Sequence, residues 1–221
     1  MATEIAVPRA SELLARMAGR RVVVVGDVMI DEWIWGRVSR ISPEAPVPVV
    51  AVQDHSFTLG GSGNVANNLR ALGAAVTFVG AVGNDAEGER VRALFAQIDC
   101  DTAGLVTLDD RPTTRKTRIV AHNQQVVRAD WESTAPLRPA DRAQVVAAVR
   151  RAVDGADAVV LSDYAKGLLH RDVVVVEEGE QEAGFVQHGT VAVAALRMDA
   201  EGLQLRLFPC FEVHARKDRL R

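Results

Sequence analysis

The chain has 221 residues, of which 48% are hydrophobic and 25% charged, and its formal net charge is −3 at pH 7. That length and apolar content can supply the core of one sizeable α/β domain, so a folded chain is expected rather than a disordered one. A nearly neutral chain without a dense Lys/Arg block predicts no nucleic-acid partner. Apolar runs such as Val22–Val25 and Val173–Val176 are far shorter than the ~20 residues that cross a bilayer, so no membrane partner is predicted.

The cysteines and histidines indicate neither a disulfide scaffold nor a metal site. Cys100 and Cys210 lie far apart and form no CxxC or Cys/His spacing, which is typical of a protein of the reduced cytoplasm. The five histidines are scattered without metal-site spacing. Before the first apolar run, Glu4 and a helical pattern over Ser11–Ala18 predict an amino-terminal helical arm over residues 1–20 and no signal peptide.

The first strand and the segment after it have different characters. Arg21–Asp27 is a β-branched run stopped by glycine, which predicts a central parallel strand buried on both faces. Asp27 then lies at the carboxyl end of a strand, where open α/β sheets bind ligands. Residues 33–58 contain three prolines and short alternating pieces, which predict short strands and loops of a small accessory sheet.

Helices and strands alternate through most of the remaining chain, which favours a layered, mostly parallel sheet. The expected elements are a helix over Asn64–Leu72, a strand over Ala75–Gly83, a helix over Asp85–Ile98, a hairpin within Thr113–Asp130, a helix over Pro139–Val153, and a strand running into a loop over Ala156–Gly167. After about His170 this alternation is lost. Apolar residues with a period of two nevertheless favour a terminal hairpin there: Leu203, Leu205, Leu207, Phe211 and Val213.

A glycine-rich turn precedes the first of these helices in the stretch LGGSGNVANNLRALGA, residues 59–74. Glycines 60, 61 and 63 allow a ligand to approach the backbone closely, and a helix start offers unpaired N–H groups. We expect Asn64 to cap the helix and to hydrogen-bond a hydroxyl or phosphate. The alternative is a tight loop before a capped helix, without a ligand.

The same glycines also match the dinucleotide pattern GxGxxA, with Asp85 nearly twenty residues further on. That fingerprint normally follows the first strand directly. Here a long insert containing prolines separates the two, so an NAD-type Rossmann enzyme ranks behind the interpretation below.

Seven segments carry a more specific signal: GDVMIDEW, SRISPEAPVPVV, GGSGNVANNLRALGA, VGNDAEG, TTRKTRI, NQQVVRAD and LSDYAKG. Together, from about Arg21 to Gly167, they resemble the amino-terminal part of a ribokinase-like (PfkB) sugar kinase. The closest resemblance is to the heptose-7-phosphate kinase domain of ADP-heptose synthesis. It implies an α/β fold with a layered, mostly parallel sheet and a small β lid over residues 21–171. Ser62 stands where such relatives usually carry alanine or another tiny residue.

The resemblance implies a reaction and its cofactors. With ATP and Mg²⁺, such kinases transfer the γ-phosphoryl group to a sugar hydroxyl, here the anomeric hydroxyl of heptose 7-phosphate. The family's catalytic aspartate lies in a Gly-Ala-Gly-Asp segment, which is absent from these 221 residues. We therefore expect residues 172–221 to be a divergent tail from truncation or a shifted frame, the carboxyl-terminal half to be missing, and activity to be impaired. The alternatives are a non-catalytic sugar-phosphate-binding or dimerising remnant, and a chain that fails to fold.

The resemblance also implies roles for individual residues. Asp31 is similar to the family's acceptor of sugar hydroxyls, while Gly60, Gly61 and Asn64 hold the sugar from the second side. Asp27 either assists or caps a loop. The resemblance implies that Lys116 and Arg128 on the hairpin bind the phosphate of the sugar. The alternative is that these basic side chains are simply solvated at the surface.

Two further groups belong to this interpretation. Lys166 and Tyr164 follow a buried strand and would face the transferring phosphate, although a surface lysine is an equal alternative. The lid with Trp33 and Trp35 would exclude water and form a homodimer with a second subunit, unless both tryptophans are ordinary core residues.

Overall fold

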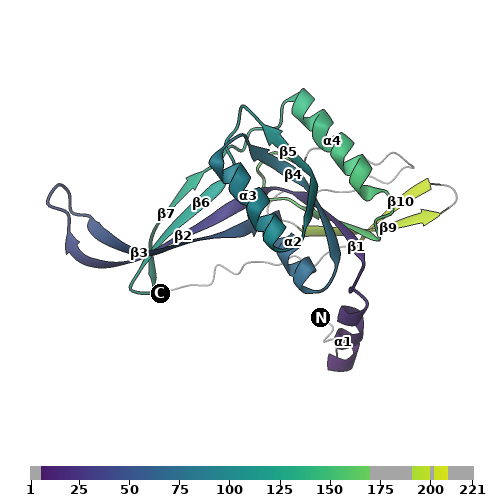
Figure 1. The fold of residues 1–221 in the computed structure, drawn as a ribbon, viewed down its shortest axis with the longest axis horizontal. Coiled ribbons are helices and arrows are strands. Elements are labelled where there is room, and N and C mark those ends of the chain that lie inside the picture. The colour runs from purple at the N-terminus through teal and green to yellow at the C-terminus, as the bar shows by residue number, and fades with distance from the viewer. Residues whose placement is uncertain (1–5, 170–190, 200–201, 209–221) are drawn as a thin grey trace.

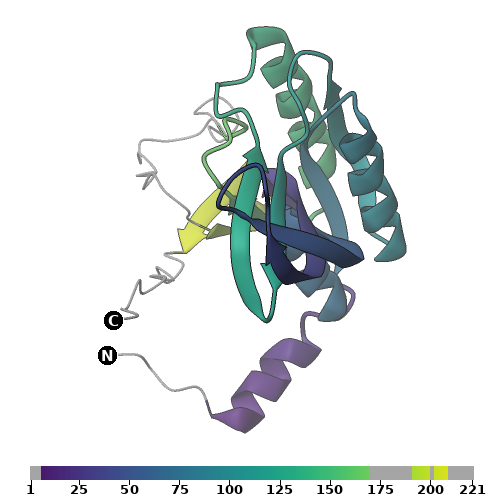
Figure 2. The same ribbon diagram turned by 90° about the vertical axis from the view of Figure 1, so that its left-hand side faces the viewer.

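The fold consists of two β-sheets, the larger of which is covered by helices on both faces (Figure 1). It is described here from a computed structural model, and the structure describes residues 6–169, 191–199 and 202–208. Its helices are α1 Val7–Ala15, α2 Ser62–Ala71, α3 Ala86–Gln97 and α4 Pro139–Val153. Helix α1 stands apart from both sheets and buries none of its residues (Figure 2).

The larger sheet has six strands in the order β10-β9-β8-β1-β4-β5. Their bounds are β1 Arg21–Gly26, β4 Ala75–Gly83, β5 Asp101–Leu108, β8 Ala158–Ser162, β9 Val191–Asp199 and β10 Gly202–Phe208. Strands β8, β1, β4 and β5 are parallel, whereas β9 runs antiparallel to both β8 and β10. The predicted layered and mostly parallel α/β sheet is therefore confirmed.

Strand β1 lies at the centre of this sheet and divides the core into two layers. Because successive side chains of a strand point to opposite faces, Val22 and Val24 pack with residues of α2 and α3, such as Phe95. Val23 and Val25 pack on the other face, against α4. The continuous valine run predicted for a doubly covered strand is confirmed, and it places Asp27 at the edge of the sheet where β1 ends.

The smaller sheet, called the lid below, has the order β3-β2-β6-β7 and projects away from the larger sheet (Figure 1). Its strands are β2 Val28–Ile41, β3 Pro48–Gly61, β6 Arg115–Ala121 and β7 Gln124–Trp131. The accessory sheet is confirmed, but the expectation of short strands over residues 33–58 was wrong, because β2 and β3 have 14 residues each. Pro43 and Pro46 lie between the two strands and Pro48 is the first residue of β3, where a missing N–H is tolerated.

Helix α2 begins two residues earlier than predicted. Gly61 is its N-cap residue, with φ 57° and ψ −132°, and no side chain caps the helix. The capping role predicted for Asn64 was therefore wrong: Asn64 lies inside the first turn and is exposed. The physical reason is the turn at Gly61, which lets the N–H of Ser62 donate to the carbonyl of Asp27 at 3.0 Å.

The other expected elements are present, with one addition, β5. The β6–β7 hairpin turns at His122 and Asn123, which both have positive φ. Strand β5 had no sequence prediction. The terminal hairpin is confirmed as β9 and β10, whereas Val173–Val176, Phe211 and Val213 lie outside the described residues. Within the described ranges, no helix has the length and apolarity needed to cross a membrane.

Candidate functional site

Four polar residues form a row across one face of the lid. Asp31 on β2 lies opposite Thr58 on β3 and Lys116 on β6, and Lys116 lies opposite Asp130 on β7. Directly opposed residues of neighbouring strands point to the same face of a sheet. The register therefore places two of the predicted site residues, Asp31 and Lys116, side by side.

The carboxylate of Asp31 is held in place from two sides. Its Oδ1 accepts a hydrogen bond from Nη1 of Arg118 at 2.5 Å, and that guanidinium lies 4.9 Å from the ring centroid of Trp33. Its Oδ2 faces Gly60, because a Cβ atom at position 60 would lie 2.6 Å from it. The absence of a side chain at Gly60 therefore leaves the space that the carboxylate occupies.

The turn at Gly61 connects this row to the start of α2. A Cβ atom at position 61 would lie 2.6 Å from the carbonyl oxygen of Asp27, and the positive φ also favours glycine. The first turn of α2 follows directly and contains the exposed Asn64. A helix amino terminus carries partial positive charge and favours ligand oxygens. Gly60 and Gly61 at the end of β3, and Asn64 in the first turn of α2, thus lie within five residues of one another where the chain leaves the lid.

Asp27 is buried and has a different environment from Asp31. Its carboxylate accepts hydrogen bonds from the backbone N–H groups of Tyr164 at 2.9 Å, Lys166 at 3.2 Å and Leu168 at 3.3 Å. Burial raises the pKa of Asp27, although these backbone bonds oppose the shift. Of its two expected roles, this geometry shows the loop cap: Asp27 holds the loop after β8 that carries Tyr164 and Lys166.

The two predicted lysines meet at a glutamate that sequence reasoning missed. Nζ of Lys116 lies 3.2 Å from Oε2 of Glu132, and Nζ of Lys166 lies 2.8 Å from the same oxygen. Lys116 also contacts Oδ2 of Asp130 at 3.1 Å, while the half-exposed Arg128 contacts Oδ1 of Asp130 at 2.9 Å. The signal that would have found Glu132 is its spacing of two from Asp130 at the end of a strand pattern.

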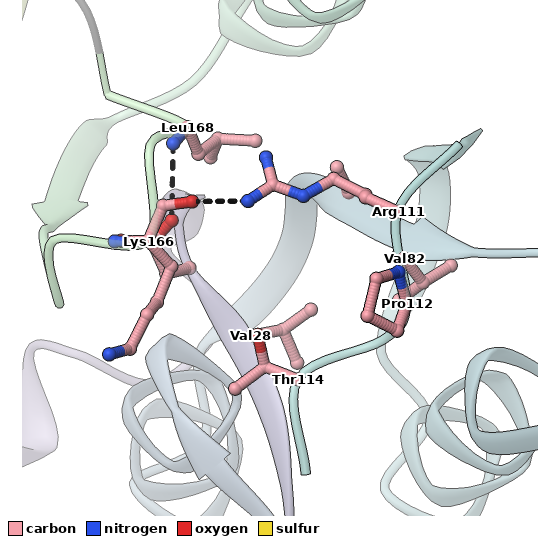
Figure 3. Close-up of a pocket in the computed structure, with 9 residues that line it drawn as sticks. Val28, Val82, Arg111, Pro112, Thr114, Lys166 and Leu168 are labelled. Carbon is pink, nitrogen blue, oxygen red and sulfur yellow. Dashed lines mark hydrogen bonds between the residues drawn. The ribbon is translucent and has the colours of Figure 1, made fainter. Parts of the chain in front are cut away.

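Arg111, also missed, ties the loop after β8 to the segment after β7. Its Nη2 donates to the carbonyls of Ser133 at 2.6 Å and Lys166 at 2.8 Å. Figure 3 shows the carbonyl of Lys166 facing Arg111 while the lysine side chain extends away from it. The pocket beside them has a volume of about 20 Å³, which is room for a single water. It is therefore no sugar site in this conformation.

The opposite face of the lid packs against α3. Glu32 is buried there, accepts a hydrogen bond from Thr117 and lies 2.7 Å from Nε2 of His55. Arg115 contacts Glu87 of α3 at 2.8 Å and its guanidinium lies 4.0 Å from the ring centroid of Trp131. These contacts anchor the root of the lid, and the row containing Asp31 lies on the face turned away from α3.

The lid tryptophans are not ordinary core residues. Trp33 and Trp35 stack on each other with ring centroids 5.6 Å apart, and Trp35 is 40% exposed. Alternation along β2 places both on the face of Asp31. They form an aromatic extension of the polar row toward the tip of the lid.

Comparisons with known proteins show which sequences this chain is similar to. Two proteins named "Bifunctional protein HldE" are similar in sequence: the one from Wolinella succinogenes is 47% identical over 148 residues, 67% of this chain and 31% of that protein. The one from Bradyrhizobium sp. (strain ORS 278) is 48% identical over 160 residues, 72% of this chain and 33% of that protein. The chain thus spans about a third of the length of the curated relatives it matches.

The fold and the family can also be assigned. A solved structure from Clostridium perfringens, described as a sugar kinase, is 17% identical with a TM-score of 0.50 over 63% of this chain and 42% of that one, and it shows the shared fold. The family model described as "pfkB family carbohydrate kinase" matches residues 20–170, which is more than half of the chain. The chain therefore belongs to the pfkB family of carbohydrate kinases.

Proposed function

We propose that this chain forms the sugar-binding part of an ATP-dependent carbohydrate kinase whose acceptor is the anomeric hydroxyl of a heptose 7-phosphate. Family membership supports the reaction class, and the motif resemblance supports the acceptor. The observation that carries the proposal is the convergence of Asp31, Lys116 and the Gly60–Gly61 turn on one face of the lid, beside the start of α2.

Asp31 provides the acceptor for sugar hydroxyls in this proposal. Its Oδ1 is engaged by Arg118, so Oδ2 is the oxygen left to accept from a hydroxyl beside Gly60. A buried hydroxyl without a partner costs roughly 1–3 kcal/mol, so the site selects ligands whose hydroxyls match its acceptors. The exposed amide of Asn64, one turn into α2, supplies a second polar group at the same edge.

Lys116 and Arg128 provide the positive charge for the phosphate of the substrate. Lys116 is half-buried and is the direct neighbour of Asp31 across the sheet, and its ammonium group contacts Asp130 and Glu132 on the side of β7. Arg128 lies further along the same side of β7, where it contacts Asp130. Tyr164 and Lys166 border the site from the loop after β8, which Asp27 and Arg111 hold in place.

The nucleotide is assigned to no residue of the described chain. The family implies ATP and Mg²⁺, which supply the phosphoryl group and neutralise its charge. In residues 6–169, however, no group of three or more His, Cys, Asp and Glu side chains is arranged to hold a metal ion. Mg²⁺ is usually held by one or two carboxylates together with the phosphates of the nucleotide, rather than by a cluster of protein side chains.

We infer that this chain binds the sugar phosphate but catalyses its phosphorylation very slowly. The resemblance assigns the proton acceptor to a Gly-Ala-Gly-Asp segment, which the 221 residues do not contain. Loss of both a general base and an anion-binding helix terminus reduces turnover by several orders of magnitude. A non-catalytic sugar-phosphate-binding protein is therefore the second candidate, and sugar-phosphate binding with no detectable ATP consumption would favour it.

Calorimetric titration of the 221-residue chain with heptose 7-phosphate tests the proposal, together with a coupled assay of ATP consumption. Asp31→Asn should weaken sugar-phosphate binding by about tenfold to a hundredfold, because a hydrogen bond to a charged group is lost. Asp54→Asn is the matched control, since it removes the same charge from an exposed position of the lid. No saturable binding by the unmodified chain, or equal effects of both variants, would contradict the proposal.

A further inference from the structure

Two ammonium groups from different parts of the fold meet at a single oxygen atom. Lys116 comes from β6 of the lid, Lys166 from the loop after β8 of the larger sheet, and both reach Oε2 of Glu132. The exposed fraction of each lysine side chain is 16%, and that of Glu132 is 25%. Glu132 follows the last residue of β7, so three separate segments are joined at this point.

An anion is required where two half-buried ammonium groups come together. Like charges in a partly desolvated place repel each other, and an anion between them removes that repulsion. The hydrogen bond from Lys166, together with Lys116, lowers the pKa of Glu132, so its carboxylate is ionised at neutral pH. Glu132 thus acts as the counter-ion of both lysines.

The carboxylate of Glu132 lies next to residues of the proposed sugar site. The inference therefore rests on the proposed function. Lys116 lies opposite Asp31 across the sheet. On the other side, Cδ2 of Tyr164 lies 3.5 Å from where a Cβ atom of Gly61 would be, and Lys166 follows in the same loop. Glu132 therefore contacts one lysine that is the strand neighbour of the hydroxyl acceptor, and a second lysine whose loop also lies beside the glycine turn.

We propose that Glu132 is an exchangeable internal counter-ion, which the anionic group of the substrate replaces on Lys116 and Lys166. A phosphate group offers three acceptor oxygens to the two ammonium groups, whereas the present contacts use one carboxylate oxygen. Glu132 lies at the end of a strand and is partly exposed, so its side chain can turn to solvent. Asp130 remains in contact with Lys116 and Arg128 after the exchange.

The exchange sets the affinity for the anion and keeps the lid joined to the larger sheet. Glu132 competes with the incoming group, so an isosteric neutral side chain at this position should strengthen anion binding. Either Glu132 or the ligand bridges Lys116 in the lid to Lys166 in the loop after β8. Glu132 is thereby a specificity-determining residue: it favours ligands that carry enough negative charge to displace a carboxylate.

Calorimetric titration of the full 221-residue chain with inorganic phosphate tests whether Glu132 competes with a bound anion. Glu132→Gln should lower the dissociation constant for phosphate by about fivefold or more relative to the unmodified chain. The matched control is Glu12→Gln, which changes the net charge equally but lies on α1 in a pair with Arg9. Glu12→Gln should leave the constant within about twofold, because screening removes effects of distant exposed charges.

A second variant keeps the test independent of folding defects. Lys166→Met in the Glu132→Gln background should abolish the gain, and cooperative thermal melts of both variants establish that they are folded. Unchanged or weaker phosphate binding in folded Glu132→Gln would overturn the inference, as would the absence of phosphate binding in every variant.

Failure of this inference is distinguishable from failure of the proposed function. One outcome is that Glu132→Gln binds phosphate more tightly while heptose 7-phosphate binds no better than phosphate. That outcome supports the counter-ion role of Glu132 and refutes the proposed sugar substrate. If the sugar phosphate binds and depends on Asp31, but Glu132→Gln shows no gain, only the counter-ion is refuted.

Discussion

Asp27 and Asp31 belong to the same short motif, but the fold gives their carboxylates opposite surroundings. Asp27 ends β1 and turns inward, where three backbone N–H groups of the loop after β8 occupy its oxygens. Asp31 lies on the face of the lid turned away from α3, with Gly60 beside one of its oxygens. One carboxylate therefore shapes the site, whereas the other is accessible to a ligand.

Ser62 has a hydroxyl group that the fold does not use. The residue is fully buried at the start of α2, and within the described residues its Oγ has no hydrogen-bond partner. A buried polar group without a partner costs roughly 1–3 kcal/mol. We expect Ser62→Ala to raise the free energy of unfolding by about 1 kcal/mol, measured by urea denaturation.

The exposed Ser11 of α1 supplies the control for this substitution. Ser11→Ala should change the free energy of unfolding by less than about 0.5 kcal/mol, as is usual for surface positions. A Ser62→Ala variant that is less stable than the unmodified chain would show that the hydroxyl has a partner, such as a buried water.

At the scale of single residues, sequence reasoning proposed groups that lie within motifs and did not name those defined by distant contacts. Asp31 and Lys116 were identified from their segments, and the register places them together. Glu132 was missed because its significance arises only where β6, β7 and the loop after β8 meet. Arg111 was missed for the same reason, since its two carbonyl partners come from separate segments.

The lid shows why the strand lengths could not be predicted. Strands β2 and β3 pair over their whole length, but the register shifts between Trp35 and Gly36 and again between Val38 and Arg40. Each such irregularity interrupts the alternation of polar and apolar residues that marks a strand in a sequence. The pattern therefore resembles several short strands, although the pairing is continuous.

Asp85 fastens α3 to the start of the lid. Its Oδ1 accepts from the N–H of Gly88 at 2.7 Å and from Oγ1 of Thr113 at 2.7 Å, and its Oδ2 accepts from the N–H of Thr113 at 2.8 Å. Burial tends to raise the pKa of Asp85, but these hydrogen bonds outweigh burial and lower it. We expect Asp85→Ala to cost about 2 kcal/mol of unfolding free energy at pH 7, since a helix cap is lost.

The pH dependence of this cost follows from the sign of the shift. A carboxylate whose pKa is lower in the folded state stabilises the fold above its unfolded value, here 3.8, and this contribution is lost as the pH falls through the folded value. The stability difference between the unmodified chain and Asp85→Ala should therefore shrink between pH 7 and pH 3. Urea denaturation at both pH values measures it, and a constant difference would contradict the assigned shift.

At the scale of the whole molecule, the parallel part of the larger sheet was predictable and its edge was not. The β-branched runs and intervening helices predicted β1, β4 and β8, which pair in parallel. The terminal hairpin was predicted from a period of two, but a local pattern cannot indicate that β9 pairs antiparallel with β8. Pairing between distant segments depends on which edge remains open after the helices have packed.

The lid has open strand edges and exposed apolar side chains. Both of its edge strands, β3 and β7, are open within the described chain, and it carries most of the large exposed apolar side chains: Trp35, Ile41, Val47, Val52, Val126, Val127 and Trp131. Open edges and exposed apolar groups favour association. We therefore propose that the chain forms a homodimer through the lid, and expect sedimentation velocity to show a concentration-dependent dimer.

Two valine substitutions locate that interface. Val52, on the edge strand β3, is 61% exposed, and Val7, on α1, is 78% exposed. Val52→Lys places a charge among the apolar groups of the lid and should shift the sedimentation coefficient toward the monomer, whereas Val7→Lys should leave it unchanged. Because both substitutions add the same charge at an exposed valine, a difference between them reports on location rather than on net charge. Dissociation by Val7→Lys instead, or a monomer at every concentration of the unmodified chain, would refute a dimer formed through the lid.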